Sequence, residues 1–211
     1  DKVIVVNKAG VGWHDNGRVN MSNEPTLIAQ MLEQSLERMN MDYFDVYMIH
    51  WPDVRVDIRK PMEILAKAKE AGKIRHIGLS NTHYDDYQLA SEVTQISCIQ
   101  EEFNFLKRNF LKNHLNWVRE NDLGVMTWGT LEKGILTGRV NSERQFDQFD
   151  ARKKAPWFKR KLIDPLILQA QADSLNLEKA LSFNLSYPEV SCALIGMKTI
   201  ADIDSIEKCL Q

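Results

Sequence analysis

The chain has 211 residues, of which 44% are hydrophobic and 27% are charged, and its formal net charge is −2. This length is enough for one sizeable domain with a continuous core. Without a basic excess, a nucleic-acid-binding or membrane-surface protein is disfavoured. No apolar stretch is long enough to span a bilayer and no signal peptide is recognisable, so we expect a cytoplasmic protein with no nucleic-acid or membrane partner.

The cysteines and histidines do not predict a metal site, because no cluster of His, Cys and carboxylate has ligand spacing. Cys98 and Cys192 lie in apolar, strand-like runs. We interpret them as small buried hydrophobic side chains in a reducing cytoplasm. We interpret four histidines as surface or core residues, namely His14, His76, His83 and His114.

Short apolar runs alternate with amphipathic segments along the chain. The runs are mostly apolar at both odd and even positions, which is typical of parallel strands covered on both faces. Pro25 after Ser22 and Asn23 marks a helix start, and Gly72 marks a helix end. The expected strands are 3–8, 44–50, 74–80, 96–100, 124–128 and 190–196; the expected helices are 24–39, 59–71, 84–93, 109–121, 175–186 and 200–210.

Six successive strand–helix units predict an α/β fold, wound into an open doubly wound sheet or a barrel. No Gly-x-Gly-x-x-Gly turn follows the first strand, which disfavours the dinucleotide-binding doubly wound sheet. A barrel of eight strands needs two more units, and Asp1 and Lys2 lead directly into the first strand. If the units are wound into a (β/α)8 TIM barrel, a single domain over residues 1–211 has about six units present and the N-terminal two missing.

Polar or aromatic side chains follow each predicted strand, at the end where such barrels carry their active sites. Neighbouring strands lie about 4.8 Å apart, so Lys8 and His50 are expected to reach the same small volume. A lysine beside a neutral imidazole polarises a carbonyl group or lowers the pKa of a nearby acid. The hydroxyl and amide groups of Ser80, Asn81 and Gln100 suit another planar amide.

Two later segments suit other parts of a ligand. Trp128 offers a flat face for stacking, and Lys198 lies where a loop leads into a helix, which suits a phosphate. The irregular segment 139–161 contains the basic stretch "ARKKAPWFKRK". We interpret that stretch as a solvated flap, with a cover over an anionic ligand as the alternative.

Several motifs together resemble the aldo-keto reductase family: "VVNKAG", "SLERMNMDYFDVYMIHWPD", "GKIRHIGLSN", "IQEEFN", "GILTG" and "VSCALIGMKT". The resemblance implies a barrel of eight strands and eight helices. It also implies hydride transfer between NADPH, or alternatively NADH, and a small-molecule aldehyde or ketone. The family's catalytic tetrad is Asp, Tyr, Lys and His. Lys8 matches the lysine that lowers the tyrosine pKa, and His50 matches the histidine that orients the carbonyl.

The resemblance further implies a cofactor site along the strand ends. Ser80, Asn81 and Gln100 match residues that hold the nicotinamide carboxamide, and Trp128 matches the aromatic residue that stacks on the ring. The other implied positions are Gly129, Thr130 and Leu131 along the pyrophosphate, Gly196, Lys198, Thr199 and Asp202 at the adenosine end, and the substrate-pocket aromatics Trp13 and Trp51.

The chain departs from the family pattern in three places. The tetrad Asp and Tyr precede the strand that here begins at Val3, and they have no counterpart in this chain. Tyr47 is no substitute, because strand alternation turns it away from the side of His50. An acidic Asp202 beside a 2′-phosphate is repulsive and weakens the expectation of NADPH. Thr130 replaces a proline, a minor loosening of its turn.

Three hypotheses follow from these residues. The first, which we favour for the complete protein, is an enzyme that reduces an aldehyde or ketone. The second is a catalytically weak or inactive nucleotide-binding or regulatory protein of the same fold, because the tetrad Asp and Tyr are absent. The third is a degenerate fragment that binds no ligand. The sequence identifies neither the substrate nor the oligomeric state.

Overall fold

A computed structural model describes residues 3–13 and 18–211; Asp1, Lys2 and His14 lie outside the described residues. The elements are β1 (Val6–Ala9), β2 (Val11–Trp13), β3 (Val19–Met21), α1 (Pro25–Met39), β4 (Phe44–Ile49), α2 (Arg59–Glu70), β5 (Ile74–Ser80), α3 (Tyr84–Ser91), β6 (Ile96–Glu102), α4 (Asn109–Asn113), α5 (Leu115–Glu120), β7 (Gly124–Trp128), α6 (Arg160–Ala172), α7 (Leu177–Leu185), β8 (Val190–Ala193) and α8 (Ile200–Leu210).

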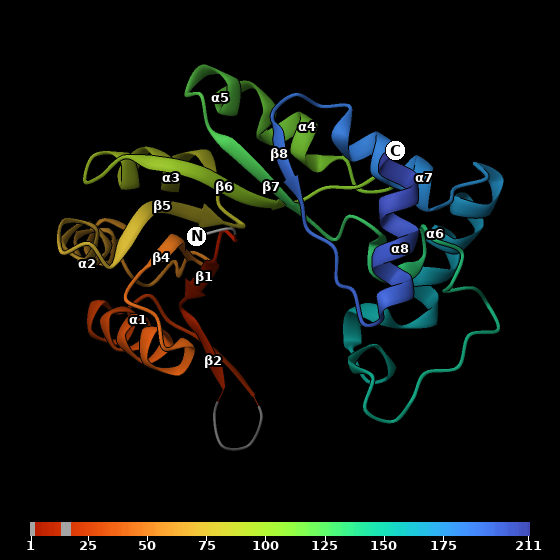
Figure 1. The fold of residues 1–211 in the computed structure, drawn as a ribbon, viewed down its shortest axis with the longest axis horizontal. Coiled ribbons are helices and arrows are strands. Elements are labelled where there is room, and N and C mark those ends of the chain that lie inside the picture. Colours follow the sequence, from red (N-terminus) through yellow and green to blue (C-terminus); the bar gives the residue numbers. More distant parts are fainter. Residues whose placement is uncertain (1–2, 14–17) are drawn as a thin grey trace. The chain divides into compact units, whose positions relative to one another are not determined.

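The predicted α/β fold with a parallel sheet is confirmed (Figure 1). Six strands lie in the order β1-β4-β5-β6-β7-β8, and β2 pairs with β3 as a separate antiparallel hairpin. Strands β1, β4, β5 and β6 pair in parallel, each with the next. The chain divides into two compact units, each described by itself below: unit 1 is Asp1–Glu101 with Leu111–Met126, and unit 2 is Glu102–Phe110 with Thr127–Gln211.

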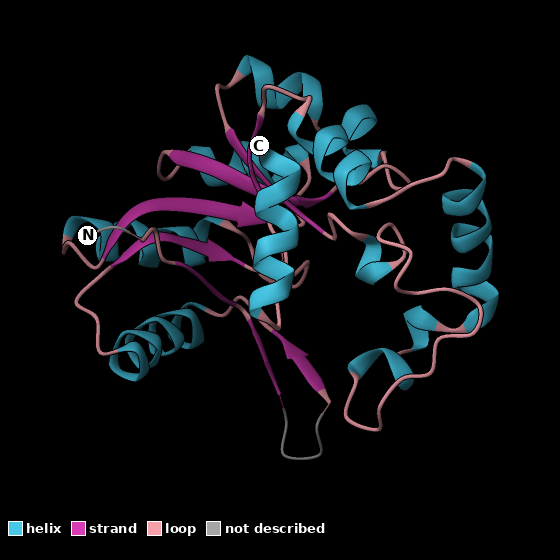
Figure 2. Cartoon of the chain, turned by 45° about the vertical axis from the view of Figure 1, so that its right-hand side comes forward, coloured by secondary structure: helices cyan, strands magenta, loops and turns pink. Residues whose placement is uncertain are grey.

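Helices α1, α2 and α3 accompany the strands of unit 1 (Figure 2). Helix α1 starts with Pro25 in its first turn and ends at Asn40, which adopts a left-handed conformation with φ 49°. Between these ends, apolar residues recur every four positions, so that Ile28, Leu32 and Leu36 are buried on one face. The helix signals in the sequence therefore act as expected.

The other face of the unit 1 strands forms a small apolar cluster. Val46 and Met48 of β4 pack with Cys98 of β6, and Val6 and Met126 join them. These residues have the same parity as Lys8, His50 and Gln100 on their strands, so the cluster continues directly toward the predicted site.

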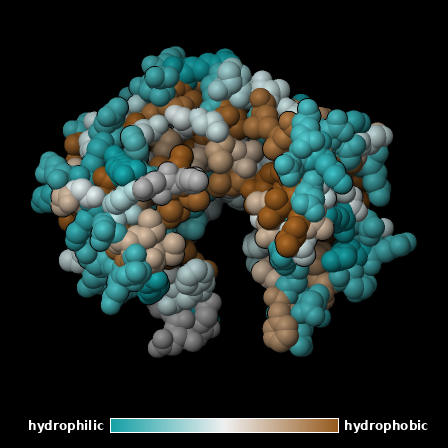
Figure 3. Space-filling view, viewed as in Figure 1, coloured by the Kyte–Doolittle hydropathy of each residue, from teal (hydrophilic) through white to brown (hydrophobic). Residues whose placement is uncertain are grey.

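Unit 2 has its own core, formed by α6, α7 and the segment before them. It includes Leu136, Phe158, Ile163 and Ile167. Helix α8 packs on α7, yet none of its residues is buried. Hydrophobic side chains gather on the surface near the start of α8 (brown in Figure 3), where Ile200 and Ile203 are exposed.

The structure corrects several sequence expectations. The first strand begins at Val6 rather than Val3. The expected helix 109–121 is two helices interrupted at His114. Cys192, expected to be buried, is exposed, whereas Cys98 is buried as expected. The difference arises because Cys192 is on the short last strand β8, most of whose residues are not covered.

Several elements were absent from the prediction. Strands β2 and β3 form a short hairpin between β1 and α1. The segment expected to be irregular contains two turns of 3₁₀ helix and runs into α6 at Arg160. Pro165 lies inside α6, but Ile163, Ile167 and Ala170 carry the helical spacing of its buried face. None of the described helices is both long and apolar enough to cross a membrane.

Candidate active site

In unit 1, polar side chains lie at the carboxyl ends of the strands, on the same face as the apolar cluster of Val46, Met48 and Cys98. Lys8 pairs in register with Met48, and Ser80 pairs with Gln100. The backbone N–H of His50 donates to the carbonyl of Ala9 at 2.9 Å, which fixes β4 against β1 beyond the paired residues. Parallel register thus places Lys8, His50, Ser80 and Gln100 on one face of these strands.

The pKa values of both Lys8 and His50 are lowered, and burial is the largest cause for each. Burial lowers the pKa of the Lys8 ammonium. Burial, and then the positive charge of Lys8, lowers the pKa of the His50 imidazole. The imidazole of His50 is therefore neutral at pH 7, and it lies within electrostatic range of the ammonium group.

The backbone turns sharply after β5, at Ser80 and Asn81. Asn81 has a φ of 53°, a left-handed conformation in which asparagine is enriched among the residues other than glycine. Its amide Nδ2 donates to the carbonyl of His50 and to Oγ of Ser80, each at 3.0 Å. Asn81 therefore joins the ends of β4 and β5, in addition to any ligand contact.

Gln100 is buried at the same edge, with 5% of its surface exposed. Its side-chain oxygen Oε1 accepts no hydrogen bond from the described residues. A buried amide oxygen without a donor is costly, so the position suits a ligand that brings its own N–H group.

Glu101, the next residue on β6, is a buried carboxyl group that the sequence analysis did not single out. Its Oε1 accepts a hydrogen bond of 2.7 Å from the backbone N–H of Thr82. Burial raises the pKa of Glu101 to about 8, although the Thr82 bond lowers it. His114 Nε2 lies 2.8 Å from the Thr82 carbonyl and 3.8 Å from Glu101 Oε2. In the sequence, the signal for this buried carboxyl group was a charged residue inside an apolar strand run.

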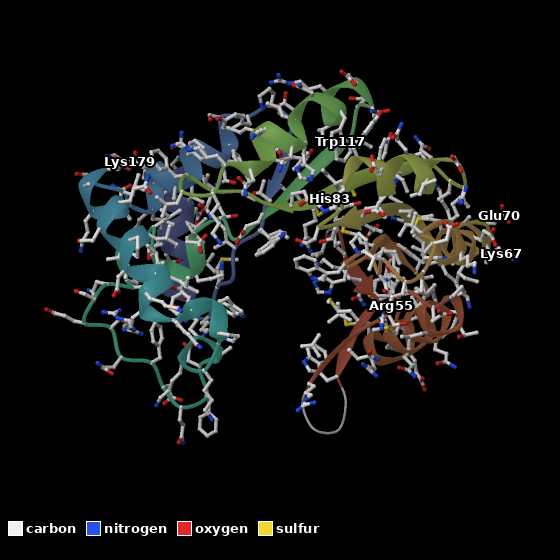
Figure 4. The ribbon with its side chains drawn as sticks, turned by 180° about the vertical axis from the view of Figure 1, so that it is seen from behind. Arg55, Lys67, Glu70, His83, Trp117 and Lys179 are labelled. Carbon is white, nitrogen blue, oxygen red and sulfur yellow. The ribbon has the colours of Figure 1, made fainter. Side chains whose placement is uncertain are left out.

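The aromatic residues assigned to the substrate pocket lie on the surface of unit 1. Trp13 ends β2 and is 72% exposed, and Trp51 follows β4 and is 39% exposed. The loop after Trp51 is tied to the hairpin by Arg55 (labelled in Figure 4), which pairs with Asp53 at 2.7 Å and donates to the Met21 carbonyl. A pocket of about 430 Å³ beside this tie is lined by Asn20, Ser22, Glu24, Leu27, Asp53, Arg55 and Val56.

In unit 2, the residues after β7 form a tight turn. Gly129 has a φ of 69°, and a Cβ atom there would lie 3.3 Å from Cγ of Glu102, so both the conformation and the space favour glycine. Thr130 is buried, and its hydroxyl donates to the Leu194 carbonyl at 3.0 Å. The threonine in place of proline therefore anchors the turn to the end of β8. Leu131 packs on the core of unit 2.

An alternating network of charges follows this turn. Glu132 is buried and accepts from Asn104 Nδ2 at 2.7 Å and from Lys133 Nζ at 3.1 Å. Lys107 contacts the carboxylates of Glu102 and Glu132. Burial lowers the pKa of Lys107, but the two carboxylates raise it above its usual value. Lys133 Nζ also lies 5.8 Å from the centre of the Trp128 ring and 5.6 Å from that of Trp157.

At the start of α8, the predicted phosphate position contains an internal carboxylate. Asp202 Oδ2 accepts hydrogen bonds from the backbone N–H groups of Lys198 and Thr199, each at 3.0 Å. Asp202 Oδ1 pairs with Arg139. The Arg139 guanidinium, with these amides, holds the pKa of the Asp202 carboxyl well below its usual range. Gly196, by contrast, has open space around its α-carbon.

The five tyrosines of the sequence have packing roles elsewhere. Burial raises the pKa of Tyr47 to about 12, and its ring packs on Phe44. The other four contact neighbouring side chains: Tyr43 lies under Arg75, Tyr84 and Tyr87 pack on Trp117, and Tyr187 packs on Phe103.

A model of the aldo/keto reductase family matches residues 1–210, so the chain belongs to the aldo-keto reductase family. It is 31% identical to the aldo-keto reductase YhdN of Bacillus subtilis over 160 residues, 76% of this chain and 48% of that protein. It is 32% identical over 149 residues to the Schizosaccharomyces pombe aldo-keto reductase yakc, whose name carries NADP(+), covering 69% of this chain and 44% of that protein.

A third relative is the NADH-specific methylglyoxal reductase of Escherichia coli, 30% identical over 184 residues, which is 79% of this chain and 55% of that protein. The chain thus spans about half the length of the curated relatives it matches.

Solved structures show the same fold. The glycerol dehydrogenase AKR11B4 from Gluconobacter oxydans superposes with a TM-score of 0.77 at 25% identity, covering 100% of this chain and 72% of that one. The holo form of the aldo-keto reductase AKR11C1 from Bacillus halodurans superposes with a TM-score of 0.79 at 20% identity, covering 99% of this chain and 67% of that one.

Proposed function

We propose that this chain provides the catalytic and nucleotide-binding residues of a cytoplasmic enzyme, one barrel domain over residues 1–211, that reduces a small-molecule aldehyde or ketone with a reduced nicotinamide dinucleotide. The observation that carries the proposal is the shared face of Lys8, His50, Ser80 and Gln100 at the strand ends of unit 1. Membership of the aldo-keto reductase family supports the reaction class.

The residues fit the nicotinamide end of such a cofactor. Gln100 Oε1 is buried without a donor from the described residues, and a carboxamide N–H group would satisfy it. Ser80 Oγ already accepts from Asn81, which leaves its own hydroxyl hydrogen to donate to the carboxamide oxygen. When bound, the reduced nicotinamide supplies the hydride.

The chain's own residues act on the carbonyl oxygen. His50 is neutral at pH 7, because burial and the charge of Lys8 lower its pKa, so an imidazole N–H donates to the oxygen and orients the carbonyl. The ammonium of Lys8 stabilises the negative charge that develops there. The proton that completes the alcohol comes from an acid whose pKa Lys8 lowers, the role that the family resemblance gives to the tetrad tyrosine.

For the hydride donor, the resemblance implies NADPH, and NADH is the second candidate. The named relatives include one of each kind. The Asp202 carboxylate, bonded to the amides of Lys198 and Thr199, supports NADH, because it repels a 2′-phosphate near the start of α8.

The test is nucleotide oxidation at 340 nm with a panel of aldehydes and ketones. Turnover with either nucleotide supports the proposal. Tight nucleotide binding without turnover on any carbonyl contradicts the assigned reaction.

A second function, nucleotide binding without turnover, is favoured by the tyrosines. All five pack elsewhere, on Phe44, Arg75, Trp117 or Phe103. Quenching of Trp128 fluorescence by nucleotide, with no consumption of it, supports this second function. If nucleotide causes no quenching, both functions are contradicted.

A further inference from the structure

The peptide groups on both sides of Thr82 are held by buried side chains. Glu101 accepts from the Thr82 N–H at 2.7 Å. The Thr82 carbonyl can only accept, so His114 Nε2, at 2.8 Å, donates to it. All three residues are buried: Thr82 is 0% exposed, and Glu101 and His114 are each 7% exposed.

These two side chains come from different elements and meet at one residue. Glu101 is on β6, and strand alternation turns it away from the face that carries Gln100. His114 is the single residue between α4 and α5, and its ring packs on that of Trp117. His83, which follows Thr82 in the chain, and Trp117 of α5 are labelled in Figure 4.

Thr82, whose N–H and C=O are both hydrogen-bonded to these side chains, directly follows the candidate carboxamide-binding residues Ser80 and Asn81. Asn81 has a φ of 53°, a left-handed conformation that asparagine adopts more readily than other non-glycine residues. The bonds to the Thr82 N–H and C=O fix the backbone that directly follows it. In this conformation Asn81 Nδ2 reaches the His50 carbonyl and Ser80 Oγ, and so orients the Ser80 hydroxyl.

We propose that Glu101 and His114 are positioning residues that hold the Ser80–Asn81–Thr82 turn in the conformation that binds the nicotinamide carboxamide. This role rests on the proposed function. Neither residue contacts the cofactor; each acts through the backbone of Thr82.

The test compares two ligands that differ in the nicotinamide alone. Calorimetry measures the binding of NADH and ADP-ribose, or of NADPH and its 2′-phosphorylated ADP-ribose, whichever pair the wild type binds. We expect Glu101→Ala to weaken dinucleotide binding about tenfold and to leave binding of the ADP-ribose unchanged. Glu101→Gln, which keeps an acceptor for the Thr82 N–H, restores wild-type binding. The matched control is His76→Gln, an exposed histidine on β5.

A second pair of variants covers the case in which Glu101→Ala does not fold. His114→Leu removes the donor to Thr82, whereas His114→Gln keeps an N–H group, so only the first is expected to weaken dinucleotide binding. Amide hydrogen exchange at Thr82 should be faster in Glu101→Ala and His114→Leu than in the wild type.

Two results contradict this role in different ways. If the wild type binds the dinucleotide and each variant weakens both ligands equally or neither, the positioning role is wrong and the proposed function stands. If the wild type binds no dinucleotide, the proposed function fails and the positioning role fails with it.

Discussion

Asp202 and Thr199 cap α8 reciprocally. The Asp202 carboxylate accepts from the backbone N–H of Thr199, and the Thr199 hydroxyl accepts from the backbone N–H of Asp202. This capping box satisfies amides that would otherwise be available to an anion at the helix start. The residue that the sequence suggested as a source of repulsion thus also has a structural role.

Replacing the carboxylate is expected to change nucleotide preference. Asp202→Asn removes a negative charge beside Lys198 and keeps an amide oxygen that can accept from the N–H groups of Lys198 and Thr199. We expect the affinity for NADPH relative to NADH to rise by roughly tenfold, because a repulsive charge near the 2′-phosphate is lost. Binding of both nucleotides by fluorescence quenching measures the ratio.

Asp204→Asn is the matched control for that substitution, because it removes an exposed carboxylate two residues further along α8. It should leave the ratio unchanged. An equal effect of both substitutions would mean that general charge, rather than the Asp202 cap, sets the preference.

The buried carboxyl of Glu101 should make stability depend on pH. Its pKa is raised by burial from an ordinary value of 4.5 to about 8. The folded state therefore binds more protons than the unfolded state between these values, and the stabilising contribution is full below pH 4.5 and is lost as pH rises through 8. The glutamine of Glu101→Gln does not titrate. As pH rises from 4.5 to 8, the free energy of unfolding of this variant should therefore increase relative to that of the wild type by roughly 1.4 kcal/mol per pH unit.

Urea unfolding from pH 5 to pH 9 measures that difference. A difference that stays constant with pH would show that Glu101 ionises at its ordinary pKa and is not desolvated.

Much of the site in unit 1 was predictable because parallel strands impose a simple rule. Once the strand runs were recognised, Lys8, His50, Ser80 and Gln100 were expected at one edge because each lies at a strand end. The observed register adds that they lie on one face. Alternation also separated Tyr47 from His50 correctly, and the structure buries Tyr47 beside Phe44. The fold class followed from the same pattern of apolar runs and amphipathic segments.

The parts that escaped prediction depend on contacts between distant residues. The hydrogen bonds that Glu101 and His114 make to Thr82 join positions 19 and 32 residues apart. A lone buried carboxyl in a strand and a histidine at a helix break are ambiguous until packing brings them together. Similarly, only the folded turn shows that Thr130 anchors to Leu194.

Substitution of His50 should separate turnover from nucleotide binding. His50→Ala removes the hydrogen bond to the carbonyl oxygen, so we expect turnover to fall by roughly 10² to 10⁴ while nucleotide affinity changes little. Steady-state kinetics and nucleotide titration measure the two quantities. His76→Ala, on the exposed part of β5, is the control and should leave both unchanged. Collapse of nucleotide binding with preserved turnover per bound nucleotide would refute the role of His50.

Lys8→Met should also abolish turnover, for an electrostatic reason. Methionine keeps much of the aliphatic length of lysine but has no charge. The charge of Lys8 lowers the pKa of His50 and stabilises the negative charge that develops at the carbonyl oxygen. In Lys8→Met the pKa of His50 is expected to rise, and an NMR titration of the imidazole measures that shift. An unchanged His50 pKa would mean that the two side chains do not interact.

Gly78 tests whether the interior packing beneath the site matters for binding. A Cβ atom at Gly78 would lie 2.7 Å from Cε of Met48 and 2.9 Å from the carbonyl oxygen of Cys98, and the latter is backbone that cannot move away alone. We expect Gly78→Ala to reduce the free energy of unfolding by about 1–3 kcal/mol, as overpacking does in cores. Gly12→Ala is the control, because no atom lies within 4 Å of its added Cβ.

The same substitution should weaken nucleotide binding, because Gly78 lies two residues before Ser80 on β5 and pairs with Cys98 of β6. Forcing β5 and β6 apart at this position moves the Ser80 hydroxyl relative to Gln100, its partner in register. Denaturant unfolding and nucleotide titration of the same preparations measure both effects. Lost stability with unchanged affinity would mean that the turn after β5 is held independently of the packing at Gly78.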